Sequence, residues 1–399
     1  MRIPNITRAA INIAGVRLRR AERHWRTVGH VLGRFGRQAH RQHERLMRAP
    51  ELARAGVQQG RGALERAQKR IARFDDHVLK PYRVERRVTR SLARAAAGSR
   101  PVIAGPWTSE VGYEALYWLP FLAWAADRYG VRRERMIAVS RGGTEPWYSG
   151  IAGSYVEIFD LVEPAEFRRQ AEARRDRGDQ KQMALSEFDR DIIRLATDRL
   201  GIRDAVVWHP GLMYQMFRAF WYGDRSLDFV LRHADFKRLQ IARPEIIATL
   251  PAEYAAVKFY TGPALPDTDT NRGAVHDLVR RVAERMPVVM LDTAWSVDEH
   301  RDYAFDDIRG VTTVRGSLDP KTNLGLQTRV IAGARQFIGT CGGLAWLAPL
   351  LGVDTLAVYE DDRYLTAHLY AAKYAYRRTG GGRFTTLNLK ALRAAGRLL

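Results

Sequence analysis

Cysteine is almost absent from this chain of 399 residues, in which Cys341 is the only example. A lone cysteine cannot close an intramolecular disulfide, which excludes a small secreted fold built on disulfides and allows a reducing, cytoplasmic compartment. No uninterrupted apolar run reaches the roughly 18–20 residues that span a bilayer. Three arginines, Arg17, Arg19 and Arg20, interrupt the apolar stretch behind Ile11, so a secretory signal is not expected.

Two common kinds of cofactor site are also missing from the sequence. No cluster of His and Cys residues stands at the spacing of metal ligands, so no metal site is predicted. No Gly-x-Gly-x-x-Gly pattern follows a first strand, which disfavours an oxidoreductase that binds a dinucleotide.

Acidic residues are scarce in the first quarter of the chain. Residues 1–100 hold 25 Lys+Arg but only 7 Asp+Glu, which gives +18 of the formal net charge of +21. Lys69 and Lys80 are the only lysines there, so arginine supplies nearly all of this charge, whereas residues 101–399 carry only +3. The first 98 residues are therefore predicted to be an arginine-rich extension with partners of its own.

This extension is predicted to be helical. Apolar residues recur at steps of three and four from Ile11 to Ala39, and a second helical stretch is expected from about Gly62 to Val78, before Pro81. A basic amphipathic helix with aromatic residues fits an anionic membrane surface, which would place the protein at the inner face of the cytoplasmic membrane. The same stripe fits self-association as a homo-oligomer, or a solvated tail. Nucleic acid is less favoured, because no recognised binding motif accompanies the charge.

The rest of the chain alternates apolar strands with amphipathic helices. The expected strands lie at 101–105, 135–140, 155–162 and 205–209, and then at 254–260, 287–292, 311–315, 336–340 and 354–359. Helices are expected between most of them. This pattern predicts an α/β fold with two Rossmann-like domains, 99–245 and 246–399, that face a cleft. Ligands of such folds bind at the carboxyl ends of the strands.

The clearest functional pattern lies at residues 336–359. An apolar strand ends at Gly339 and Thr340, the small residues Cys341, Gly342 and Gly343 follow, and a helix then begins. Such a turn lets the main chain approach a ligand closely, and the free N–H groups that begin a helix attract anions. The pattern predicts a diphosphate site, although tight helix–strand packing in any Rossmann-like domain would give the same turn.

These residues resemble the donor domain of GT-B glycosyltransferases, in particular the bacterial heptosyltransferase-like and fucosyltransferase-like branches. The similarity consists of the strand, the small-residue turn, the helix and the run Leu-Gly-Val-Asp-Thr-Leu-Ala at 351–357. The resemblance implies a GT-B-like fold and a metal-independent transferase without a cofactor. It also implies that four residues hold the diphosphate of a nucleotide sugar: Thr340, Cys341, Gly342 and Gly343.

Three more residues of the second half are candidates for donor binding. Lys258 lies in the apolar strand Tyr-Ala-Ala-Val-Lys-Phe-Tyr, and the resemblance implies that a basic residue here neutralises donor phosphates. An unpaired lysine is costly to bury, so Lys258 is expected to reach either a phosphate or a carboxylate. Arg272 offers a weaker version of the same argument, with a solvated arginine as the alternative. Glu360 follows a strand and is expected to hold ribose hydroxyls or to lie in a solvated loop.

The first half is expected to hold the acceptor and the catalytic base. In the resembling family an acid after the first strand deprotonates the acceptor hydroxyl, and the matching position here is Glu110, preceded by Ser109 where the family usually has Gly before Asp. Glu110 equally fits an acid that caps the following helix. His209 is a second candidate base, with a packed loop histidine as its alternative. Three residues are expected to bind the acceptor: Trp107, Glu114 and Arg141.

Together these patterns predict a bacterial-type GT-B glycosyltransferase, inverting and metal-independent. It would move a sugar from a nucleotide sugar to a cell-surface polysaccharide, a glycolipid or a related glycan acceptor. Two alternatives stay open: a group transfer like that of polysaccharide pyruvyl transferases, and a non-catalytic binding protein that keeps the fold. An enzyme requires Glu110 or His209 to face Lys258 and the 340–343 turn across one cleft, whereas a binding module does not.

Overall fold

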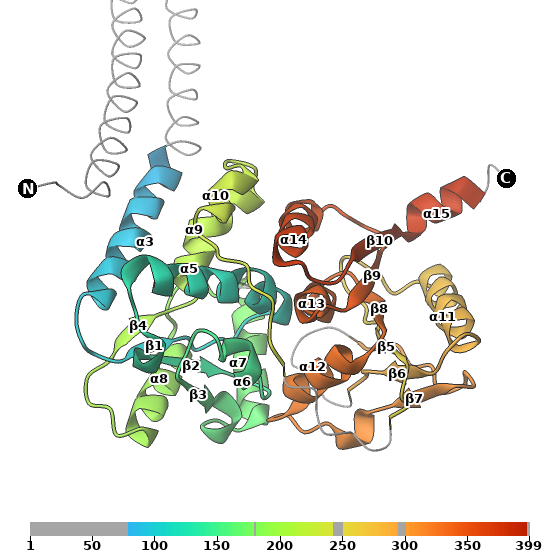
Figure 1. Cartoon of the computed structure of the whole chain (residues 1–399), viewed down its shortest axis with the longest axis horizontal. Coiled ribbons are helices and arrows are strands. Elements are labelled where there is room, and N and C mark those ends of the chain that lie inside the picture. The colour runs from blue at the N-terminus through green and yellow to red at the C-terminus, as the bar shows by residue number, and fades with distance from the viewer. Residues whose placement is uncertain (1–78, 179–180, 242–249, 294–300, 397–399) are drawn as a thin grey trace, which may run out of the picture. The chain divides into compact units, whose positions relative to one another are not determined.

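The computed structural model describes residues 79–178, 181–241, 250–293 and 301–396 (Figure 1). The chain divides into two compact units, residues 1–79 and 80–399. The amphipathic stripe expected between Ile11 and Ala39, the helix expected before Val78 and the domain boundary expected near 245 all lie outside the described residues. They stay predictions.

The first half of the second unit is a parallel sheet of four strands in the order β3-β2-β1-β4. In register, Val102 of β1 lies between Met136 of β2 and Val206 of β4. The strands are short and largely buried because both faces are covered, as in other parallel sheets. Their bounds are Val102–Ala104 (β1), Met136–Ser140 (β2), Ser154–Glu157 (β3) and Val206–Trp208 (β4).

The helices of this half follow the strands along the chain. Between β1 and β2 the chain passes through α4, a π-helical turn and α5 without a break, as the expected helix at 110–129 requires. Gly130 ends α5 in the left-handed conformation, with φ of 65°. The bounds are Val111–Tyr113 (α4), Glu114–Trp118 (the π turn), Leu119–Tyr129 (α5), Glu145–Tyr148 (α6), Pro164–Asp176 (α7), Glu187–Arg199 (α8), Gly211–Trp221 (α9) and Leu227–Leu231 (α10).

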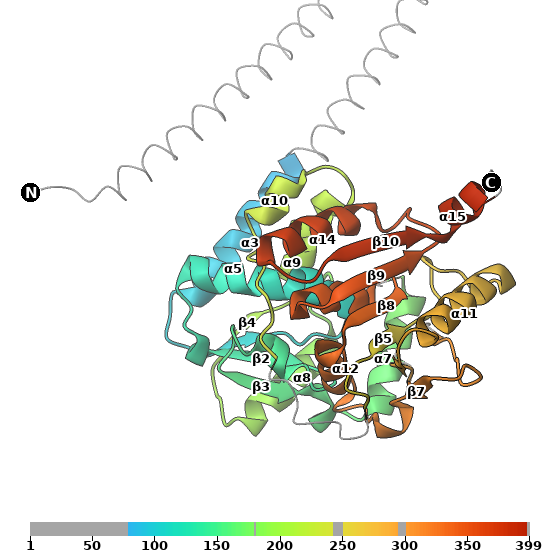
Figure 2. The same cartoon turned by 45° about the vertical axis from the view of Figure 1, so that its right-hand side comes forward.

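The second half is a parallel sheet of six strands in the order β10-β9-β8-β5-β6-β7 (Figure 2). Lys258 at the end of β5 pairs in register with Gly339 of β8. The strands are Ala255–Lys258 (β5), Val288–Met290 (β6), Val311–Thr313 (β7), Gln336–Thr340 (β8), Asp354–Tyr359 (β9) and Phe384–Asn388 (β10). The helices are Asp269–Ala283 (α11), Asn323–Gly333 (α12), Gly343–Leu347 (α13), Thr366–Thr379 (α14) and Leu389–Gly396 (α15). A 3-10 turn, Ala348–Leu351, continues α13.

The last part of the expected extension belongs to this second unit. Helix α3, Lys80–Ala96, begins with Pro81 in its first turn and buries Pro81, Val88 and Leu92. It packs against α5, β4 and α9. The sequence analysis placed a break at Pro81, but a proline at the first helical position begins a helix, since its fixed φ suits the helix and the missing N–H has no partner there.

The two halves share one apolar core. A single cluster of buried side chains runs from Trp107 and Trp118 of the first half to Trp346 and Tyr376 of the second. Six of the described helices and strands were not predicted: α3, α6, α9, α10, β10 and α15. Strand β10 pairs only with β9 and reads Phe-Thr-Thr-Leu-Asn, too short and too polar to be distinguished from a loop.

Candidate functional site

The turns that follow the strands of the two sheets meet between the halves. A Cβ built on Gly112 of α4 would lie 2.8 Å from Cδ1 of Trp346 and 3.0 Å from the main-chain nitrogen of Gly343. Gly112 therefore lets the turn after β1 pack directly on the turn after β8. The predicted acceptor loop and the predicted donor turn are thus brought together, although 228 residues separate Gly112 from Thr340.

A second contact joins the halves nearby. The N–H of Gly325 at the start of α12 donates to the carbonyl of Gly142 at 2.8 Å. A Cβ on Gly325 would lie 2.5 Å from the carbonyl oxygen of Gly143, so no larger residue fits. Beside it, Nε1 of Trp147 donates to Oγ1 of Thr328 at 3.0 Å. The halves therefore touch through the main chain at the carboxyl end of each sheet.

The turn after β8 is shaped by glycine. Gly342 and Gly343 have φ of 150° and 35°, and a Cβ on Gly342 would lie 2.5 Å from the hydroxyl oxygen of Tyr260. Thr340 Oγ1 exchanges hydrogen bonds of 2.9 Å with the main chain of Tyr260, and the N–H of Cys341 donates to Val358. Within the described residues, the N–H groups of Gly342 and Gly343 donate no hydrogen bond. The nitrogen of Gly343 lies against Gly112 of α4, so these main-chain donors stand at the junction of the two turns.

Lys258 lies at the same edge of the second sheet but has partners of its own. Its Nζ lies 2.7 Å from Oδ2 of Asp302 and 2.8 Å from the carbonyl oxygen of Leu291. The N–H of Thr293 donates to the same Asp302 oxygen at 2.7 Å. Of the two partners expected for Lys258, the structure shows the carboxylate.

The other two donor candidates are also paired. Arg272 is half-exposed in the first turn of α11 and forms ion pairs with Asp267 and Asp269. Glu360, just beyond β9, pairs with Arg393 of α15 and accepts a 2.8 Å hydrogen bond from the buried Asn271 amide. These pairs lie within the second half and connect α11, β9 and α15.

Glu110 stands at the start of α4, between the two sheets' turns. Its carboxylate makes no hydrogen bond to the helix main chain, so the capping role considered from the sequence is not seen. Instead Oε1 lies 2.6 Å from Nζ of Lys181, and 44% of the side chain is exposed. The same Nζ lies 3.8 Å from the ring centre of Tyr113. Glu110 is therefore a partly accessible carboxyl group paired with a lysine.

Two arginines hold the loop that leads to Glu110. Nη2 of Arg141 donates to the carbonyl of Ser109 at 2.7 Å, and Nη2 of Arg174 donates to the carbonyl of Thr108 at 2.6 Å. Arg141 is buried, and its guanidinium lies over the ring of Phe167. Two guanidinium groups thus hold the main chain of the loop between β1 and α4.

Glu114 and Trp107, both expected to bind acceptor, are fully buried. Oε1 of Glu114 accepts hydrogen bonds of 2.6 Å from Ser140 and from Tyr148, while Oε2 is buried without a partner in the described part of the chain. Burial raises the pKa of this carboxyl to about 7, against the opposing effect of Arg141. Trp107 stacks on Trp118 and Tyr214. The carboxyl and the indole thus lie beneath the loop rather than on its surface.

His209, the second candidate base, belongs to another buried group. The N–H of Gly211 donates to its Nδ1 at 3.0 Å, so the neutral ring carries its proton on Nε2, which lies 3.3 Å from Oδ2 of Asp189. Burial raises the pKa of Asp189, but the hydrogen bonds from His209 and Ser186 outweigh it, and the pKa is lowered. Both nitrogens of His209 therefore have partners.

A histidine that the sequence analysis did not single out connects the halves. Nε2 of His368 on α14 lies 3.0 Å from the hydroxyl of Tyr113, and Nδ1 lies 2.7 Å from that of Tyr117. Burial lowers the pKa of His368 to about 3, with a smaller contribution from the charge of Lys181. The ring is therefore neutral at physiological pH and connects α14 to α4.

Metal ligands do not gather anywhere in the part of the chain that the structure describes, where no three His, Cys, Asp or Glu side chains could hold one ion. Two Asp-x-Asp sequences do occur. In one, Asp189 binds His209, and in the other Asp267 and Asp269 bind Arg272. None of the described helices is long and apolar enough to cross a membrane.

Comparison with known proteins gives structural similarity alone. No family model and no curated protein matches the chain. The chain is similar to a family 9 glycosyl transferase from Veillonella parvula, at 11% identity over 75% of this chain and 88% of that one, with a TM-score of 0.42. It is similar to E. coli heptosyltransferase WaaC with ADP, at 16% identity over 75% of this chain and 98% of that one, with a TM-score of 0.36. It is also similar to E. coli ADP-heptose lps heptosyltransferase II, at 13% identity over 65% of this chain and 85% of that one, with a TM-score of 0.35.

The fold is α/β. The parallel sheets of four and six strands confirm the α/β fold with two parallel-sheet halves that was expected from the sequence. Because all three TM-scores lie below 0.5, no residue role follows from these similarities. The roles of individual residues have to be argued from their contacts in this chain.

The site contains residues that the sequence analysis missed as well as ones it named. The structure packs Gly112, two residues after Glu110, on Gly343, and Arg141 bonds the carbonyl of Ser109 before Glu110. It engages Lys258, Arg272, Glu360 and His209 in other pairs. Lys181 and Arg174 were missed. They follow Glu110 by more than 60 residues, in a polar stretch without a motif, so only the folded arrangement reveals them.

Proposed function

We propose that this protein is a glycosyltransferase that moves a sugar from a nucleotide sugar to a hydroxyl of a glycan or glycolipid acceptor. The observation that carries the proposal is the contact of Gly112 with Gly343 and Trp346. It joins a carboxylate-bearing turn of the first sheet to a glycine turn of the second sheet. This contact supports the proposal because transfer from a nucleotide sugar requires a base and an anion site beside each other.

Glu110 is the proposed base. Its carboxyl group is partly exposed, is not used as a helix cap and lies 2.6 Å from Nζ of Lys181. It takes the proton of the acceptor hydroxyl, whose oxygen attacks the anomeric carbon of the sugar from the face opposite the diphosphate. The bond between that carbon and the diphosphate oxygen breaks, and the nucleoside diphosphate leaves with the electron pair. This step inverts the configuration and leaves the proton on Glu110.

The leaving diphosphate is proposed to bind the turn at Thr340–Gly343. The N–H groups of Gly342 and Gly343 are the donors, because two successive main-chain N–H groups in such a turn form an anion-binding concavity. Arg141 and Arg174 hold the loop that carries Glu110 and add positive potential around the reacting groups. Thr340 fixes the turn through its two hydrogen bonds to Tyr260.

Nucleotide binding tests the donor site. The full chain is screened by thermal unfolding against UDP, GDP, ADP, CMP and dTDP, where a ligand at 100 times its Kd adds about 2.7 kcal/mol of stability. The substitution Gly342→Ala, which brings a Cβ within 2.5 Å of the Tyr260 hydroxyl, should abolish the shift. Gly316→Ala is the matched control, because nothing lies within 4 Å of its Cβ. No shift with any nucleotide would overturn the proposal.

The base is tested separately from donor binding. Once a nucleotide is identified, Glu110→Gln should leave its Kd unchanged and lower the rate of sugar transfer by roughly 100- to 10,000-fold. Glu172→Gln, an exposed glutamate on α7, is the control and should leave the rate unchanged. Unaltered transfer by Glu110→Gln would remove Glu110 from the mechanism and leave the donor site standing.

A further inference from the structure

Helix α3 presents one face made of arginine. Arg83, Arg86, Arg87, Arg90 and Arg94 are exposed, and their spacings of three and four residues put them on one side of the helix. Val88 and Leu92 point the opposite way, into the core of the second unit. The arginine face is therefore fixed rigidly to the body that carries the candidate site.

Within the described ranges, three arginines of this face, Arg86, Arg90 and Arg94, form no ion pair with an acid. Ser91 lies among the five arginines on the same side of α3 and is also exposed. Arg87 bonds the neutral amide of Gln215. The single acid of α3, Glu85, lies 3.5 Å from His233. Like charges one turn apart on a helix repel each other, so the face gains when an anion binds.

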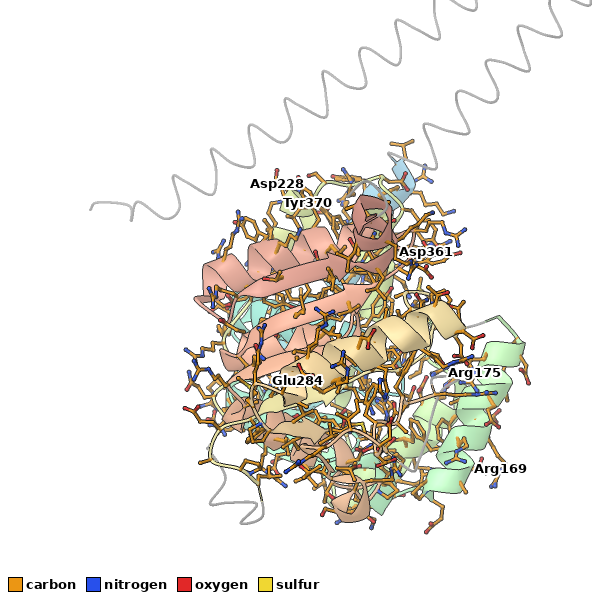
Figure 3. All side chains as sticks on the ribbon, turned by 90° about the vertical axis from the view of Figure 1, so that its right-hand side faces the viewer. Arg169, Arg175, Asp228, Glu284, Asp361 and Tyr370 are labelled. Atoms are coloured by element: carbon orange, nitrogen blue, oxygen red, sulfur yellow. The ribbon has the colours of Figure 1, made fainter. Side chains whose placement is uncertain are left out.

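Exposed tyrosines lie on α3 itself and on helices linked to it through α9. Helix α9 packs against α3 and also against α10 and α14. Tyr82 on α3, Tyr222 at the end of α9, and Tyr370 and Tyr374 on α14 are all exposed. Helix α14 also carries Lys373, Arg377 and Arg378 and contains no Asp or Glu. Figures 1 and 2 show α3, α10 and α14 at the same end of the unit, and Figure 3 shows Tyr370 there.

We infer that this end of the protein docks on an anionic lipid surface, with the α3 arginines on lipid phosphates and the tyrosine rings at the headgroup level. Arginine favours phosphate because its guanidinium donates two parallel hydrogen bonds. Tyrosine, apolar in the ring and polar at the hydroxyl, favours the boundary between lipid and water. The tyrosines are spread over three helices rather than along one groove, which suits a surface better than a single nucleic acid strand.

Docking at this end has a consequence for the site. Helix α14 carries exposed tyrosines on one side and the half-buried His368 on the other, where His368 contacts Tyr113 and Tyr117. One helix thickness, about 10 Å, thus separates the docking surface from the candidate active site. The inference goes beyond sugar transfer and does not depend on it, since binding to lipid requires no donor and no acceptor.

Vesicle binding by the full chain tests the inference. The chain is titrated with vesicles of phosphatidylglycerol mixed with phosphatidylcholine, and with phosphatidylcholine alone. We expect binding to the anionic vesicles only. The triple substitution Arg86→Glu, Arg90→Glu and Arg94→Glu should weaken binding by at least roughly 100-fold, because each basic residue near an anionic surface contributes about fivefold. The control is Arg281→Glu, Arg285→Glu and Arg309→Glu, three exposed arginines far along the chain with the same change of charge.

A fluorescent reporter shows which face meets the lipid, independently of charge on residues 1–79. The native thiol Cys341 is buried, and burial raises its pKa, so a cysteine introduced by Ser91→Cys is labelled selectively with a polarity-sensitive dye. Its emission should shift to the blue on anionic vesicles, while the same dye at Ser317→Cys, an exposed site after β7, should not respond.

Four results would overturn the inference. They are no binding to anionic vesicles, equal losses in the two arginine triples, binding without a response at position 91, and a stronger response at position 91 to duplex RNA than to vesicles. The inference would also be overturned if the dye at position 91 responded to a higher protein concentration in the absence of vesicles, because the partner would then be a second copy of this chain.

Discussion

The unpaired oxygen of Glu114 gives the protein a stability that depends on pH. Burial raises the pKa of this carboxyl from 4.5 to about 7 in the folded chain. A group whose pKa is raised by folding stabilises the fold fully below its unfolded pKa, and that contribution is lost as the pH rises through the folded pKa. A change of about 2.5 pKa units corresponds to about 3 kcal/mol, all lost between roughly pH 4.5 and pH 7.

Glu114→Gln removes this titration while it keeps the shape. The amide oxygen can accept the hydrogen bonds of Ser140 and Tyr148, and the amide nitrogen replaces the unpaired Oε2. The substitution also leaves two N–H donors unpaired, a cost that does not vary with pH. The expected result is therefore a difference in stability that changes with pH: from about pH 4.5 to pH 8, the variant gains about 3 kcal/mol relative to the native chain.

Thermal unfolding measures this change. For a unit of about 320 residues, 1 kcal/mol corresponds to roughly 1.5 °C in Tm, so the Tm difference between variant and native chain should change by about 4–5 °C over this range. Glu172→Gln serves as the control, because an exposed glutamate should give a constant difference. Parallel Tm curves for Glu114→Gln and the native chain would refute the reasoning and show that Glu114 is ionised in the folded state throughout.

Three further substitutions have defined outcomes. Gly112→Ala forces a Cβ against Trp346 and should cost about 1–3 kcal/mol of stability by denaturant unfolding, whereas Gly273→Ala, with open space around it, should cost nothing. His368 stabilises the fold when neutral, so stability should be lost as the pH falls from 6.5 toward about 3, by about 3 kcal/mol at pH 4. His368→Gln should therefore show a smaller decline in Tm over this pH range. An equal decline in the variant and the native chain would show that His368 does not cause it. Lys258→Met leaves the carboxylate of Asp302 without its cation and should lower the free energy of unfolding by about 3–5 kcal/mol. Adding Asp302→Asn should restore part of this stability in the double variant. No recovery of stability would mean that the two residues are not coupled.

Much of the fold could be predicted because it follows local patterns. Strand β8, the glycine turn and α13 are contiguous, and an apolar run followed by small residues is enough to identify them. The same holds for β1 and the helical stretch after it. Strand β10 and helix α9 were missed, since a short polar edge strand and an aromatic helix lack a clear period.

The candidate site could be predicted only in part, because its contacts join distant segments. The glycines of the turn and Glu110 were recognisable from their local sequence. The partner of Lys258 was not, since Asp302 lies 44 residues away in a polar loop. The pairing of His368 with Tyr113 spans 255 residues, and no local pattern distinguishes it from an ordinary helical histidine. Such pairs depend on how the two halves pack, which a single sequence does not state.

The main-chain hydrogen bond between Gly325 and Gly142 allows the opening of the two halves to be followed by the exchange of a single amide proton. The N–H of Gly325 belongs to the second half and its acceptor to the first. That amide proton exchanges with solvent only when the halves part or the start of α12 unfolds. The exchange rate of this proton, compared with that of an amide deep in β8, gives the free energy of opening. A ligand that bridges the halves slows the exchange, and more strongly the more tightly the ligand binds the closed form.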